Sequence, residues 1–145
     1  MSPPARRFLV ASAFFLVLGL LLHALALFDA WLGFNPFAIT TDGAMRQALL
    51  IGWLGQLGLA LAYDRWLPGS PGAMRVFWLL NAGLILGIAG QPGLAVILRF
   101  ILPGQPGLAS PLAAGLGMGA SLGGLLQLAA GGVFAWEVWR RFPPA

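Results

Sequence analysis

The feature that most constrains the fold of this chain is the near absence of charge from four long apolar stretches. Only 8% of its 145 residues are charged and 59% are hydrophobic, whereas soluble domains carry about 25% charged residues. The stretches cover residues 8–31, 45–66, 76–102 and 112–139, and each reaches the roughly 20 residues that a helix needs to cross a bilayer. The sequence therefore predicts an all-α integral membrane protein. We expect one transmembrane domain over residues 1–145, embedded in the lipid bilayer as a multi-pass protein of the cell membrane.

Proline and glycine cluster between the stretches, at residues 33–36, 68–72 and 103–107. Because proline lacks an N–H and clashes with the preceding turn, these connectors should end the helices. Four helices joined in this way form an up-down bundle. The first apolar run exceeds the core of about 7–15 residues in a secretory signal peptide, so we expect it to be retained as the first span.

The third stretch is longer than one span, and Gln91-Pro92-Gly93 interrupts it. Either the helix kinks there and continues, or it stops near Gly90 and residues 94–102 lie along the interface. Arg99 favours the second alternative, because its guanidinium can reach water at the headgroups. We therefore expect a break near residues 91–93.

The arginines predict the orientation of the bundle. With four spans, one side of the membrane carries both termini and the second loop, and six arginines belong to that side: Arg6, Arg7, Arg65, Arg75, Arg140 and Arg141. The other side has only Arg46 and Arg99. Since positive charge accumulates on the cytoplasmic side, both termini should be cytoplasmic.

The residue inventory excludes several classes of chemistry. The chain has no cysteine, one histidine and four acidic residues, which are too few for a thiolate, zinc or di-iron site. Its serines lack a nearby base of suitable depth, so we expect no catalytic residues and no metal site. The net charge of +4 is spread over the chain without a basic face, which argues against nucleic acid as a partner.

Two glutamines and a run of glycines are the candidate packing residues. Gln56 and Gln127 lie near the centres of their stretches, and an amide in hydrocarbon must find a partner. We expect an interhelical hydrogen bond between the second and fourth helices, the alternative being a polar track through the bundle. Gly115, Gly119 and Gly123 recur every four residues and predict a smooth face for a close helix, of this chain, of another membrane subunit or of a second copy.

Two further segments have a recognisable pattern: residues 48–55 and 58–63, which end in Trp66-Leu67-Pro68, and residues 77–84. They resemble helix 2 and helix 3 of the catalytic subunit of heme-copper oxidases, especially its nitric-oxide-reductase-like branch. Residues 124–141 are similar to the last helix of small four-helix relatives of that subunit. The resemblance implies a shared scaffold of the N-terminal helices and a setting in the respiratory chain.

The histidine that ligates the low-spin heme in helix 2 of that family is absent here. Met45, Arg46 and Gln47 stand at about those positions, so His23 and Met45 are the candidate heme ligands that remain. We predict no bound heme and a structural or accessory membrane component without catalysis of its own. The alternatives are a heme-binding electron-transfer protein and a small-solute transporter that acts as an oligomer.

Overall fold

The computed structural model describes residues 1–32, 37–96 and 106–143, and all regular structure in these ranges is helical. The elements, in chain order, are α1 (Pro3–Leu32), α2 (Phe37–Arg46), η1 (Gln47–Gly55), α3 (Gln56–Arg65), α4 (Ala73–Val96) and α5 (Pro106–Arg141). Three of them contain candidate membrane spans, at Pro3–Leu27, Ala73–Gly90 and Ala114–Arg141. The protein is therefore a small helical protein whose described residues include three helices long and apolar enough to cross a membrane.

The second predicted span is divided between α2, η1 and α3, which follow one another without a loop. Arg46 and Gly55, at the two ends of η1, both have right-handed helical backbone angles. The chain is thus helical from Phe37 to Arg65, and its start precedes the predicted residue 45. The middle element is a π-helix, a rare conformation that is frequent at functional sites, and the apolar pattern gave no sign of it.

The first helix begins earlier than the apolar run because its start is capped. The Ser2 hydroxyl accepts a hydrogen bond from the Ala5 N–H at 3.4 Å, and the Arg6 N–H donates to the Ser2 carbonyl at 3.1 Å. Pro3 then occupies the first helical position, where a missing N–H costs nothing. Arg6 and Arg7 consequently lie on the first turns of α1 and not in a preceding loop.

Helix α4 continues through Gln91-Pro92-Gly93 and ends at Val96. The end of the helix expected near Gly90 therefore does not occur there. Transmembrane helices tolerate proline where neighbouring groups satisfy the freed carbonyl. Residues 97–102 of the expected interfacial segment, with Arg99, lie outside the described residues. Helix α5, which contains the fourth predicted span, begins at Pro106 and includes Pro111, whereas the sequence predicted a start at residue 112.

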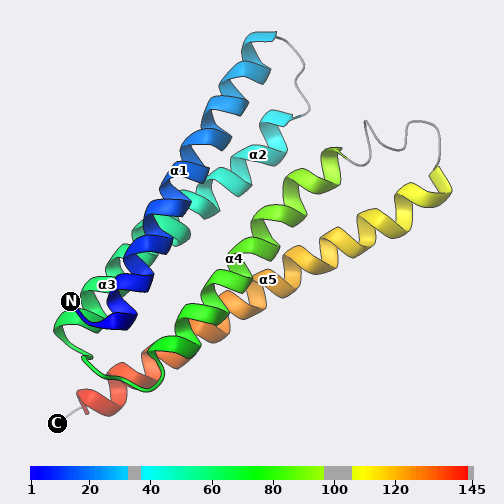
Figure 1. The fold of residues 1–145 in the computed structure, drawn as a ribbon. Coiled ribbons are helices and arrows are strands. Elements are labelled where there is room, and N and C mark those ends of the chain that lie inside the picture. Colours follow the sequence, from blue (N-terminus) through cyan, green and yellow to red (C-terminus); the bar gives the residue numbers. More distant parts are fainter. Residues whose placement is uncertain (33–36, 97–105, 144–145) are drawn as a thin grey trace.

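The helices form two hairpins that meet at one end of the molecule (Figure 1). The first hairpin pairs α1 with the α2–η1–α3 path, and the second pairs α4 with α5. The start of α1, the turn at residues 66–72 and the end of α5 lie together, and we call this the terminal end. Because α5 packs along α4 on the outside of the first hairpin, the arrangement is more open than the expected bundle.

The expected orientation gives a direct prediction, because the chain has no native cysteine. Single cysteines in place of Pro71 and Phe142, both exposed at the terminal end, should react with a membrane-impermeant maleimide only after cells are opened. The physical reason is the excess of arginine at this end. A cysteine in place of the exposed Gly43, on α2, is the control and should react in intact cells. Labelling of Pro71→Cys in intact cells would contradict the orientation.

Candidate functional site

Four aromatic side chains from four helices meet near the terminal end. The ring of Phe8 on α1 stacks on Tyr63 of α3, with centroids 5.4 Å apart, and meets the edge of Phe77 on α4 at 5.2 Å. Tyr63 in turn contacts the ring of Phe134 on α5 at 5.8 Å. Phe8 and Tyr63 are buried, so these rings join the two hairpins through their apolar surfaces.

A carboxylate lies next to these rings at the terminal end. Glu137 of α5 accepts a hydrogen bond from the Tyr63 hydroxyl at 2.6 Å and from the Gly72 N–H at 2.7 Å. It also accepts one from the Ser70 hydroxyl. We call these four residues the Glu137 cluster. It ties the end of α5 to α3 and to the turn between α3 and α4, with three donors on a single side chain.

The turn itself is shaped for this contact. Gly69 has φ of +72°, a left-handed conformation that glycine adopts without strain, and the Ser70 N–H donates to the Leu67 carbonyl at 3.2 Å. A Cβ atom at Gly72 would collide with the Glu137 carboxylate. A pocket of about 330 Å³ lies beside the turn, lined in part by Arg140 and Arg141.

Sequence reasoning did not single out the Glu137 cluster. A signal was available, since Tyr63 is the only tyrosine of the chain and Glu137 its only glutamate. A carboxylate within a predicted span must find a partner, and the tyrosine at the end of the second span was the candidate. With three donors on its oxygens, the carboxylate is suited to hold helices together and poorly placed to accept a proton from a substrate.

The two glutamines singled out by sequence each form a hydrogen bond with α4. The expected hydrogen bond was one between the second and fourth predicted helices. Gln56 is fully buried, and its Nε2 donates to Asn81 Oδ1 at 3.1 Å, while Asn81 Nδ2 returns a bond at 3.4 Å. The Nε2 of Gln127 donates to the Gly83 carbonyl at 3.0 Å. Since α4 lies between the α2–η1–α3 path and α5, it forms a hydrogen bond with a glutamine amide on each side.

One buried amide oxygen in the described part of the chain has no partner. It is Oε1 of Gln47, at the first residue of η1 and beside Gly87 of α4, where an added Cβ would come within 2.8 Å of it. The other midspan amides, those of Gln56, Asn81 and Gln127, are engaged inside the bundle. These amides are therefore not available as a continuous row of polar groups, which a pathway for a solute would need.

Of the three candidate packing glycines, Gly123 lies at a helix contact. A Cβ built there would be 2.7 Å from both the Gly83 carbonyl oxygen and the Gly87 nitrogen on α4. Gly115 and Gly119 have no atom of the described residues within 4 Å of such a Cβ. The close approach of α4 and α5 thus involves Gly83 and Gly87 facing Gly123, and Gly90 facing Leu116 and Ala120.

The candidate heme ligands lie side by side. Nδ1 of His23, an exposed residue on α1, is 3.2 Å from Sδ of Met45 on α2. An iron ion bound axially by both atoms would have to lie between them, so the two side chains would first have to separate. No group of three or more histidine, cysteine or acidic residues that could hold a metal ion occurs among the described residues.

Comparison with known proteins identifies no relative of this chain. No family model matches it, no curated protein matches it, and no solved structure matches it. The resemblance to the oxidase catalytic subunit therefore gains no support from these comparisons. What the sequence and structure establish together is a small multi-pass helical protein with apolar helix surfaces suited to lipid contact.

Proposed function

We propose that this protein is a structural or accessory component of a membrane complex, which binds another membrane protein through the outer face of α5 and performs no chemistry of its own. The observation that carries this proposal is the position of α5. Only 11% of its span is buried inside the protein, against 44% for the span of α4. This helix, the longest of the described elements, thus packs mainly on α4, contacts α3 near the terminal end, and leaves most of its surface open.

The composition of the open surface supports a protein partner on part of it. One narrow stripe along α5 carries mostly small residues at alternating spacings of four and three: Gly117, Ser121, Gly124, Leu128, Gly131 and Ala135. A Cβ at Gly117, Gly124 or Gly131 would meet no atom within 4 Å among the described residues. Small residues let helix backbones approach closely and are enriched where transmembrane helices meet.

A groove beside the stripe extends the same surface. It has a volume of about 260 Å³ and lies between α5 and the η1–α3 path, where Gly131 and Phe134 face Ile51 and Leu59. Its lining is almost entirely apolar. A transmembrane helix laid along α5 would fill this groove and remove the glycines from lipid. The resemblance to oxidase helices suggests a respiratory complex as the setting.

A photoreactive amino acid in place of Leu128, in the middle of the stripe and 74% exposed, tests the proposal in native membranes. We expect a crosslink to a different membrane protein. The matched control replaces Val17, which is exposed at the middle of α1, and should give no protein adduct. A product of about twice the 15.2 kDa chain mass would mean self-association, and crosslinks to lipid alone would mean no partner; either would contradict the proposal.

A further inference from the structure

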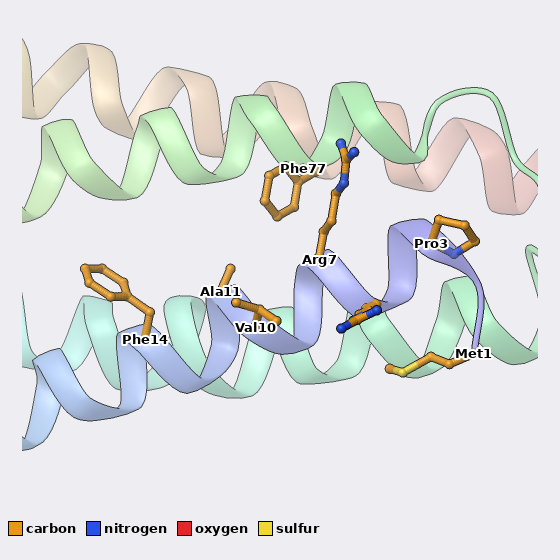
Figure 2. A pocket seen from close by; sticks show the side chains of 8 residues that line it. Met1, Pro3, Arg7, Val10, Ala11, Phe14 and Phe77 are labelled. Atoms are coloured by element: carbon orange, nitrogen blue, oxygen red, sulfur yellow. The ribbon is translucent and has the colours of Figure 1, made fainter.

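A groove opens between α1 and α4 near the terminal end, on a part of the surface that the proposed function does not use. Its volume is about 760 Å³, within the range of about 300–1,000 Å³ that is typical of small-molecule sites. Figure 2 shows Arg7 extending from α1 toward α4 beside Phe77, with Val10, Ala11 and Phe14 following along α1. The groove is therefore charged at one end and apolar along the rest.

The charged end of the groove has no acidic side chain to neutralise it. Arg6 and Arg7 both line it, and the ion pairs within the described ranges involve other cations: the N-terminal amine with Asp64, and Arg46 with Asp42. The Ser2 N–H also donates to Asp64 at 2.7 Å. The hydrogen-bond partner of the Arg7 guanidinium is the sulfur of Met74, at 3.4 Å. Two arginines thus line the groove without an ion pair to Asp64, which pairs with the N-terminal amine of Met1, another lining residue.

The apolar part of the groove runs along α1, a helix long and apolar enough to cross a membrane. From Arg7 to Phe14 the helix rises about 10 Å, at 1.5 Å per residue, which places Phe14 below the headgroups when Arg7 lies among them. Phe14 is 60% exposed and Val10 63%, and Phe77 of α4 lines the opposite side. An alkyl chain beside these side chains would lie parallel to α1, as a lipid chain does.

We propose that this groove binds one anionic phospholipid, with its phosphate on Arg6 and Arg7 and an acyl chain against Val10, Phe14 and Phe77. Guanidinium groups recognise phosphate by paired hydrogen bonds. Basic pockets between transmembrane helices on the cytoplasmic side are sites for anionic headgroups, and the arginine distribution assigns the terminal end to that side. The occupant is a lipid and not a free phosphate, since most of the lining is apolar.

Native mass spectrometry of the full-length protein, extracted in the presence of equal amounts of phosphatidylglycerol and phosphatidylcholine, tests this proposal. We expect the wild type to retain one phosphatidylglycerol. Each arginine near an anionic headgroup contributes about a fivefold gain in affinity, so the double variant Arg6→Gln/Arg7→Gln should bind it about 25-fold more weakly. Added inorganic phosphate should not displace the lipid.

Two further variants separate a defined site from general charge attraction. Arg140→Gln/Arg141→Gln removes the same charge from the same end of the protein but outside the groove, and should keep the bound lipid. Ala11→Phe leaves both arginines in place and fills the groove, and should lose the lipid. Equal losses in the two arginine pairs, full retention by Ala11→Phe, or displacement by phosphate would each overturn the proposal. If Arg6→Gln/Arg7→Gln does not fold, the Ala11→Phe result decides.

Discussion

Leucine in place of Gly123 should separate α5 from α4 and cause a large loss of stability. The backbones approach so closely that even a Cβ would lie 2.7 Å from the Gly83 oxygen and the Gly87 nitrogen. These are backbone atoms and cannot rotate away as a side chain could. Overpacking of this kind costs about 1–3 kcal/mol in soluble cores, and we expect at least the upper end here, because the helices must move apart along their contact.

The adjacent glycine provides a matched control for this substitution. Gly124 has no atom of the described residues within 4 Å of an added Cβ, so Gly124→Leu makes the same change one position along the same helix without a collision. Thermal unfolding in detergent, followed by circular dichroism, should show a large decrease in midpoint for Gly123→Leu, a smaller one for Gly123→Ala, and almost none for Gly124→Leu. Equal midpoints for the two leucine variants would contradict the contact.

The reason that only Gly123 of the three predicted glycines meets α4 is geometric. Residues four apart on a helix of 3.6 residues per turn are rotated by about 40°, so Gly115, Gly119 and Gly123 drift by about 80° around α5. A helix that touches the last of them is turned away from the first. The repeat predicts a close helix, but which glycine meets it depends on the angle at which α4 crosses.

The helical architecture was predictable because burial in lipid leaves a strong and local signal. Twenty apolar residues between proline-rich turns give a helix almost regardless of what surrounds them, and α1, α4 and α5 lie where the apolar runs are. The helix ends were less predictable. Pro3, Pro92 and Pro106 all lie inside helices, because proline is compatible with a helix start and is tolerated within membrane helices.

The candidate sites depended on partners that are distant in sequence, and prediction was weaker for them. That Gln56 must find a partner follows from its place in an apolar run, but the partner, Asn81, is set by the register of α3 against α4. The same holds for Glu137, which is 74 residues from Tyr63. Local spacing predicts which residues need a partner, and only the packing of the hairpins determines which residue supplies it.

Replacing Glu137 by glutamine should release the end of α5 from the rest of the terminal end. The carboxylate accepts hydrogen bonds from Tyr63, Ser70 and Gly72, and hydrogen bonds to a charged group contribute about 1.5–3 kcal/mol each. A glutamine offers one oxygen, and its NH₂ group faces donors that it cannot satisfy. We expect the free energy of unfolding to fall by about 3 kcal/mol. Since each kcal/mol lowers the midpoint by about 3 °C in a chain of this size, the unfolding midpoint should fall by about 10 °C.

The partners of Glu137 determine how this result is to be interpreted. Tyr63→Phe removes one donor and keeps the ring stacked on Phe8, so its effect should be smaller, and once Glu137 is glutamine the tyrosine change should have little further effect. Arg140→Gln, on the same helix but exposed, is the control for a change of charge and should leave the midpoint nearly unchanged. If Glu137→Gln and Arg140→Gln melt at the same temperature, or if the effects of Tyr63→Phe and Glu137→Gln simply add, the cluster does not act as one unit. The two hairpins would then be held at this end by other contacts, among them those between the aromatic rings of Phe8, Tyr63, Phe77 and Phe134.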